Sequence, residues 1–135
     1  MDTVYPQGKK NEIVGFEGFT CAQIFLGLTS NLIFLSLMHT ESEGPDALLD
    51  FIRYVGCPKR LHSNRSKMQL SKVVTKICRK NLIPQTTTEA HHPWQNPAER
   101  SVQELKKLGT YFLDQGNAPW AAWGFAFMHA AWCLN

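Results

Sequence analysis

The chain has 135 residues, of which 44% are hydrophobic and 19% are charged. This length allows one domain with a buried core, and the balance is that of an ordinary globular protein. The N-terminus lacks the apolar stretch of a signal peptide, and we find no internal repeat or low-complexity run. The most apolar segment, residues 119–135, is shorter than the about 20 residues that a bilayer span needs, so we expect no membrane partner.

The distribution of charge is more informative than the net charge of +3. Nine basic residues and no acidic residue lie between Phe51 and Thr88. This asymmetry indicates a polyanionic partner, although a solvated helix face would give the same pattern. The nine residues are Arg53, Lys59, Arg60, Arg65, Lys67, Lys72, Lys76, Arg79 and Lys80.

The four cysteines do not suggest a metal site. No two of them form a CxxC pair, and no cysteine–histidine spacing resembles that of a zinc site. We therefore expect buried thiols in a reducing compartment. The four are Cys21, Cys57, Cys78 and Cys133.

The patterns of apolar and polar residues predict a mixed α/β fold. A short first strand precedes two apolar segments that are typical of a meander. Helices and strands then alternate, which indicates a mixed sheet with helices on both faces. In chain order, we expect strands at 2–5, 19–27 and 31–38, a helix at 42–56, a strand at 58–63, a helix at 66–81, a strand at 83–89, a helix at 97–114 and a last helix from Pro119.

Glu99 has two interpretations. With Asn96 as N-cap and Pro97 as the first helical residue, Glu99 is the third helical residue, where acids commonly stabilise a helix start. It also shares one polar stripe with Gln103 and Lys106, because these residues follow helical spacing. A carboxylate and a lysine on one rigid face would suit a metal ion next to a phosphate backbone.

A two-metal phosphoryl-transfer site needs acidic side chains from separate elements that meet at one place. Asp2 begins the first expected strand, and Asn64 follows the strand at 58–63. We expect positions 2, 64 and 99 to share one cleft.

Four ordered segments resemble the catalytic core of LTR-retrotransposon and retroviral integrases, with copia-type elements the most similar. Residues 2–25 look like the first two strands of that core, and residues 46–64 like the helix and strand that lead to its second acid. Residues 83–107 resemble the segment with the third acid, which is the most specific match. Residues 119–135 are similar to the closing Trp, Ala and Asn pattern.

The resemblance implies a ribonuclease H-like fold with a five-stranded mixed sheet flanked by helices, here with a truncated first strand. It implies one catalytic-core domain over 1–135, without the family's zinc-binding N-terminal domain or its C-terminal domain. The family uses an Asp, Asp, Glu (DDE) triad with two Mg²⁺ (or Mn²⁺) ions. By resemblance, Asp2 takes the first acid position and Glu99 the third, while Gln103 and Lys106 correspond to DNA-contacting positions.

The second acid position departs from the family, because it holds Asn64. An amide oxygen still suits Mg²⁺, but the formal carboxylate charge falls from −3 to −2, so two dications are harder to hold. We expect weakened metal binding and a loss of activity of at least about three orders of magnitude. Asn64 would also serve as the N-cap of the helix at 66–81, and both roles are compatible.

The first functional interpretation is an integrase-like domain for DNA integration by metal-dependent strand transfer, whose catalysis is impaired. Its expected partners are retroelement DNA ends, target DNA and a second copy of the chain, and its expected compartment is the nucleus. The alternative is a non-catalytic DNA-binding or protein-interaction module, because the last helix carries many aromatic residues. A third reading is unstable folding caused by the truncated first strand. The expected DNA-binding residues are Lys67, Lys72, Lys76, Gln103, Lys106 and Lys107.

Overall fold

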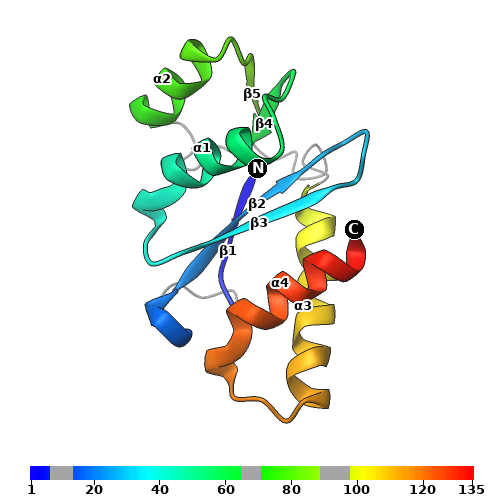
Figure 1. The fold of residues 1–135 in the computed structure, drawn as a ribbon. Helices are drawn as coiled ribbons and strands as arrows, with labels where there is room; N and C mark the ends of the chain where they lie inside the picture. Colours follow the sequence, from blue (N-terminus) through cyan, green and yellow to red (C-terminus); the bar gives the residue numbers. More distant parts are fainter. Residues whose placement is uncertain (7–13, 65–70, 89–97) are drawn as a thin grey trace.

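The computed structural model describes residues 1–6, 14–64, 71–88 and 98–135. Within these ranges every expected strand and helix is present, in the expected order (Figure 1). The strands are β1 (Asp2–Val4), β2 (Cys21–Leu26), β3 (Ile33–Met38), β4 (Leu61–Ser63) and β5 (Gln85–Thr87). The α-helices are α1 (Gly44–Tyr54), α2 (Lys72–Lys80), α3 (Ala98–Gln115) and α4 (Trp123–Leu134).

The strands form two small sheets, whereas the sequence predicted one sheet of five strands. β1, β2 and β3 pair antiparallel, with Asp2 opposite Ile24. β4 and β5 pair parallel to each other. The reason for the division is the short β1: its ladder with β2 begins at Asp2, and it contacts β4 through the Met1 ammonium, which donates to the His62 carbonyl at 3.0 Å.

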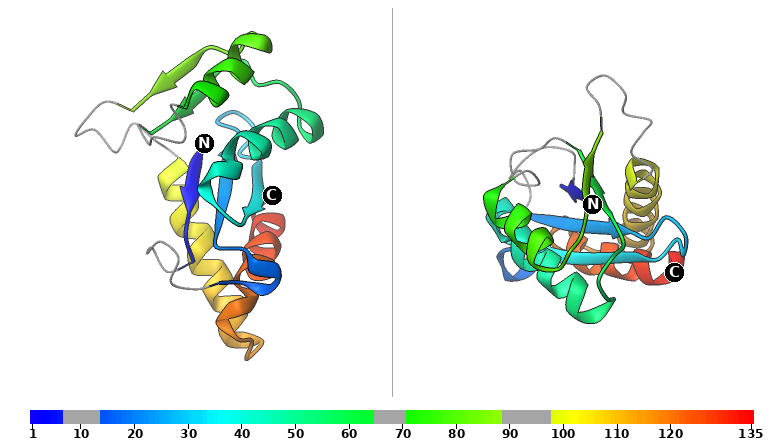
Figure 2. Two further views of the ribbon diagram at one scale, coloured as in Figure 1. Left: turned by 90° about the vertical axis from the view of Figure 1, so that its left-hand side faces the viewer. Right: turned by 90° about the horizontal axis from the view of Figure 1, so that it is seen from above.

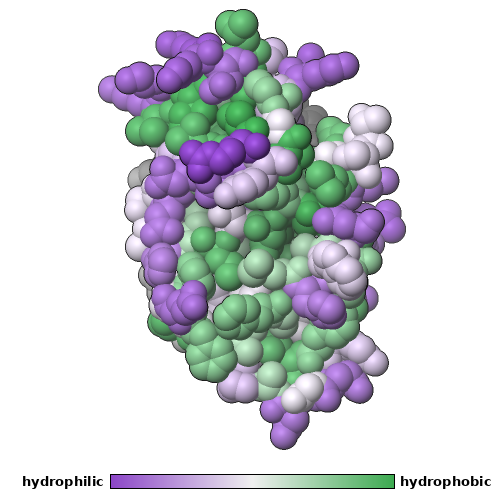
Figure 3. Space-filling model, in the orientation of Figure 1, coloured by the Kyte–Doolittle hydropathy of each residue, from purple (hydrophilic) through white to green (hydrophobic). Residues whose placement is uncertain are grey.

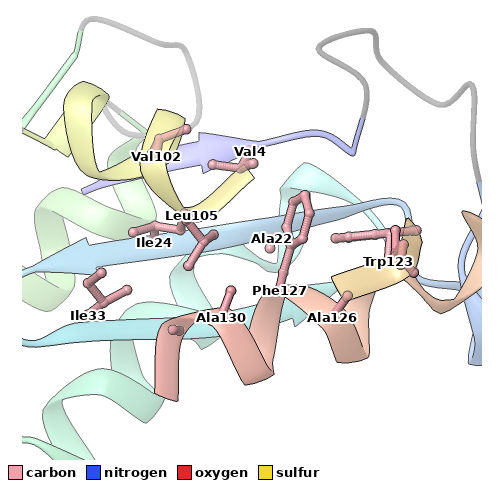
Figure 4. Close-up of a cluster of buried hydrophobic side chains, with 12 residues drawn as sticks. Val4, Ala22, Ile24, Ile33, Val102, Leu105, Trp123, Ala126, Phe127 and Ala130 are labelled. Atoms are coloured by element: carbon pink, nitrogen blue, oxygen red, sulfur yellow. The ribbon is translucent and has the colours of Figure 1, made fainter. Parts of the chain in front are cut away.

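Strand β2 separates two hydrophobic clusters because its side chains point alternately to opposite faces. Ala22 and Ile24 belong to the cluster covered by α3 and α4 (Figure 4). Cys21 and Phe25 belong to the cluster covered by α1 and α2. Figure 2 shows the same division, with α2, β4 and β5 at one end of the molecule and α3 and α4 toward the other. Helices on both faces are therefore confirmed.

Helices α3 and α4 are held together by close aromatic packing. Trp123 and Phe127 of α4 are completely buried, and their rings meet edge to face at 5.4 Å. Gly109 of α3 lets them approach, since a Cβ there would lie 2.4 Å from Phe127 Cδ1. Each such aromatic side chain contributes about 1.5–3 kcal/mol by burial. This packing fixes the helix that carries Glu99 and Lys106.

The end of the chain is fixed to the outer strand. The Asn135 side chain accepts from Ile33 N at 2.7 Å and donates to Ile33 O at 2.8 Å. It thus satisfies the backbone N–H and C=O of one residue on the outer edge of β3. Within the described ranges, no helix combines the length and apolar character needed to cross a membrane.

The expectation of four buried cysteines was only half right. Cys21 and Cys78 are buried in the cluster beneath α1 and α2. Cys57 and Cys133 are exposed, because one follows the end of α1 and the other lies in the last turn of α4, away from the sheet. All four are free thiols.

The buried Met1 ammonium should make stability depend on pH. Burial lowers its pKa from 8.0 to about 6, against the opposing charge of Asp2. Between these values the unfolded chain binds more protons than the folded one, so stability rises with pH. We expect the free energy of unfolding to gain about 2 kcal/mol from pH 6 to pH 8, measured by urea unfolding. In an N-acetylated protein, which keeps the N–H but has no charge, this contribution should vanish; an unchanged pH slope would contradict the assignment.

Candidate metal and nucleic-acid site

Two residues of the candidate site lie side by side, one at the start of β1 and one just after the end of β4. Asp2 is the first residue of β1, and Asn64 directly follows β4. Asn64 Nδ2 donates to Asp2 Oδ1 at 3.0 Å, and the Thr3 backbone N–H donates to the same oxygen at 2.9 Å. Two residues that are far apart in the sequence are thus in direct contact, and both are half-buried.

A buried glutamine holds the strand that carries Asp2. Gln23 lies in β2 with no exposed surface. Its Nε2 donates to the Asp2 carbonyl at 2.9 Å, and its Oε1 accepts from Thr3 Oγ1 at 2.9 Å. Gln23 was not predicted as a site residue, although a lone polar residue within the apolar run CAQIF is a usable signal.

Glu99 and Lys106 approach Asp2 from α3. Burial raises the pKa of Asp2, and the negative charge of Glu99 raises it further, while the Thr3 N–H, the Met1 ammonium and Lys106 oppose the shift. Burial lowers the pKa of Lys106, and Asp2 opposes this shift. Because such effects act over short distances, the two α3 side chains lie in the electrostatic field of Asp2. The structure therefore brings positions 2, 64, 99 and 106 to one region.

The remaining predicted residues lie on exposed surfaces. Gln103 and Lys107 are exposed on α3, and Lys72 and Lys76 are exposed on α2. Lys67 lies outside the described residues. So do Asn96 and Pro97, so the capping interpretation of Glu99 stays untested. Asn64 is not the cap of α2: that helix begins at Lys72, and Ser71 Oγ accepts from Val74 N at 3.3 Å.

The chemistry of the donor set fits Mg²⁺ in kind. Carboxylate and amide oxygens are the ligands that Mg²⁺ prefers, and Asp2, Asn64 and Glu99 offer two carboxylates and one amide. Throughout the described ranges, no group of three or more His, Cys, Asp or Glu side chains is placed to hold a metal ion. The two negative charges of this donor set suit one bound Mg²⁺ ion better than two bound ions.

Replacing Asn64 by aspartate should destabilise the metal-free protein in a pH-dependent way. Asn64→Asp places a second carboxylate at hydrogen-bond distance from Asp2, which raises the pKa of the pair, so stability is lost as pH rises through that value. We expect a loss of about 1–3 kcal/mol at pH 7, less at pH 4. Urea unfolding at both pH values measures it. Asn64→Ala removes the hydrogen bond without adding charge and should show no such pH dependence; equal losses at both pH values for Asn64→Asp would refute the repulsion.

No protein-family model matches the sequence, and no curated protein matches it. Solved structures with a similar fold do exist. The HTLV-2 integrase catalytic core domain in complex with magnesium, in its trimeric form, has a TM-score of 0.69 and 23% identity, covering 90% of this chain and 78% of that one. Its dimeric form gives 0.67 and 24%, covering 85% and 74%.

A third similar structure is a simian T-cell lymphotropic virus intasome in complex with the PP2A regulatory subunit B56 gamma. It has a TM-score of 0.63 and 24% identity over 83% of this chain and 41% of that one. At this level of identity the comparisons establish the fold and leave the copia-type resemblance a prediction. The chain therefore has the α/β fold of retroviral integrase catalytic cores.

Proposed function

We propose that this chain is an integrase-like domain for DNA integration by metal-dependent strand transfer, with weakened catalysis. The observation that carries the proposal is the hydrogen bond between Asn64 and Asp2, in the field of Glu99 and Lys106, on an integrase-core fold. These residues come from β1, the end of β4 and α3. Metal-assisted phosphoryl transfer needs metal-binding side chains that converge from separate elements of the fold.

Each residue has a distinct part in this mechanism. Asp2, Asn64 and Glu99 would hold Mg²⁺, which would supply charge neutralisation and activate the nucleophile. Lys106 lies on α3 within the electrostatic influence of Asp2 and would donate to a DNA phosphate oxygen. The packing of α3 against α4 keeps Glu99 and Lys106 on one rigid element.

Asn64 weakens the site in two ways. It lacks the negative charge of an aspartate, and its amide nitrogen faces Asp2 Oδ1, which is an oxygen needed for the metal. A metal ion would have to displace this hydrogen bond and attract the amide oxygen instead. The neutral amide also offsets less of the cost of removing water from Mg²⁺.

Restoring the carboxylate should restore activity. We expect Asn64→Asp to raise Mg²⁺-dependent strand transfer by at least about three orders of magnitude over the natural sequence. The measurement is joining of labelled DNA ends to a target plasmid in Mg²⁺ or Mn²⁺. Adding Glu99→Gln to Asn64→Asp should remove the gain, because it deletes another ligand. Equal, strong activity in the natural sequence and in Asn64→Asp would overturn the impairment.

DNA binding is proposed for the basic surface of α2 and its surroundings. Lys72, Lys76, Arg79 and Lys80 are exposed on this helix. Arg53 of α1 is different, because it lies 3.8 Å from Asp50 and is partly neutralised. The nucleus is the proposed compartment, since integration requires chromosomal DNA.

Binding to duplex DNA should weaken steeply as salt increases, because released counterions drive it. We expect Lys76→Gln to reduce the slope of log affinity against log salt by about one. Fluorescence anisotropy from low to physiological ionic strength measures the slope. Arg53→Gln removes the same charge from the Asp50 pair and should change the slope less. An affinity that does not depend on salt would exclude this mode of binding.

A second candidate function is a protein-interaction module, favoured by the outer surface of α4. Trp132 is 74% exposed, Phe125 53% and Met128 49%. Figure 3 has the orientation of Figure 1, in which α4 and β3 lie on the face shown. This face is largely hydrophobic in its middle and hydrophilic along its edges. Patches of this kind commonly mark contacts between chains.

Self-association through this surface should be visible by sedimentation. We expect a concentration-dependent dimer at high micromolar protein, weakened at least about tenfold by Trp132→Gln, because Trp contributes strongly to interfaces. Leu82→Gln is the matched control, since Leu82 is an exposed apolar residue in the turn after α2. A strict monomer at these concentrations would argue against the interface.

A further inference from the structure

The exposed side of α4 carries a histidine and a cysteine whose side chains meet. His129 Nε2 and Cys133 Sγ lie 3.7 Å apart. The two residues are four positions apart in one helix, so their side chains lie on the same face. Both are exposed, and the Cys133 thiol is free. Neither was predicted as a metal ligand, because two such residues make only half of a zinc site.

The separation of the two atoms fits adjacent ligands of one tetrahedral Zn²⁺ ion. Zinc–nitrogen and zinc–sulfur bonds of about 2.0 and 2.3 Å, at the tetrahedral angle, hold the two ligand atoms about 3.5 Å apart. A small side-chain movement is therefore enough to bring His129 and Cys133 from 3.7 Å to this geometry. Because the thiolate is the species that binds zinc, the Cys133 thiol would release its proton to solvent.

The packing around the pair restricts the His129 ring before any metal binds. Its centroid lies 4.7 Å from that of Phe112 on α3 and 5.8 Å from that of Trp132, on which it stacks. The end of α4 is attached to β3 through the Asn135 side chain. Ligands that are already oriented lose less conformational freedom on binding, so this pair is better prepared than two mobile surface residues.

The pair needs ligands from outside its own helix. Across the described ranges, no third His, Cys, Asp or Glu joins it in a group that could hold a metal ion. A second copy of the chain would bring an identical His129 and Cys133. Two-fold symmetry would then complete a tetrahedral site with two cysteines and two histidines.

The charges on α4 favour a site shared between two copies. The helix has no acidic and no basic residue from Trp123 to Leu134. Two thiolates neutralise one Zn²⁺ ion, so the completed site would carry no net charge and would tolerate burial between two apolar surfaces. Phe125, Met128 and Trp132 supply exposed apolar surface on the same helix.

We propose that two copies of this chain share one Zn²⁺ ion, to which each contributes His129 and Cys133. The proposal rests on the same surface of α4 that is proposed above for self-association, and it names the metal that would strengthen that contact. It does not depend on strand transfer. Coordination requires defined ligand positions, so zinc would also fix how the two helices face each other.

Sedimentation of the full chain under reducing conditions compares dimerisation in a chelator with dimerisation in Zn²⁺. If zinc binds only the dimer, the dimer dissociation constant should fall about tenfold at a free Zn²⁺ concentration about ten times that of half-saturation. Cys133→Ser should remove the zinc effect, because a neutral hydroxyl is a poor zinc ligand. Cys57→Ser changes the other exposed cysteine and should leave the effect intact.

The zinc site and the apolar interface fail in different ways. A dimer that forms equally in chelator and in Zn²⁺, and that Trp132→Gln weakens, would refute the zinc site and keep the interface. A strict monomer under both conditions would refute both. A dimer that forms only with Zn²⁺, and that Cys133→Ser abolishes, would support the zinc site alone.

Cobalt reports the ligands directly, because Co²⁺ bound to thiolate gives a sulfur-to-metal charge-transfer band. Oxygen ligands such as Asp2 and Glu99 give no such band, so the candidate Mg²⁺ site does not interfere. We expect the band to saturate at one Co²⁺ per two chains and to disappear in Cys133→Ser. His129→Gln, a change at an exposed side chain, should remove the tetrahedral spectrum. Saturation at one ion per chain, or a band that survives Cys133→Ser, would overturn the shared site.

Discussion

The contact between the start of β1 and the end of β4 is the constraint on which the candidate site depends. Two hydrogen bonds form it, from the Met1 ammonium to the His62 carbonyl and from Asn64 Nδ2 to Asp2 Oδ1. They join the antiparallel sheet to the parallel pair, because β1 belongs to the first and β4 to the second. The hydrophobic cluster that contains Met1, Phe25 and Leu61 joins the same two parts of the molecule.

The second support of the site is the rigidity of α3. Leu105 and Gly109 bury one face of this helix against the sheet and against Phe127. The same helix carries Glu99 and Lys106, whose charges act on Asp2. The hydrophobic core thus holds the helix that carries these two charged residues. Gln23, which is buried, holds the strand that carries Asp2.

Asn64 changes the balance between folding and metal binding. Three carboxylates at one place repel each other when no cation is bound, which costs stability. An amide removes one charge and replaces the repulsion with a hydrogen bond to Asp2. The same change removes the charge that would hold a second dication. In the proposed metal site, this exchange would favour a stable metal-free protein over strong metal binding.

The sequence alone determined the order and type of the elements, because local periodicity and turn residues carry that information. It also placed Asp2 at the start of β1, Asn64 after β4 and Glu99 in the first turn of α3. The expected five-stranded sheet was not found in the described residues, since local patterns do not report how many backbone hydrogen bonds a short strand completes.

Only the tertiary structure decided which distant residues meet. The hydrogen bond between Asn64 and Asp2 and the buried role of Gln23 depend on pairing across the chain. It also decided which aromatic residues of α4 are buried and which remain exposed, since Trp123 and Trp132 look alike in the sequence. The physical reason is that burial and pairing are properties of packed elements, whereas sequence patterns describe each element alone.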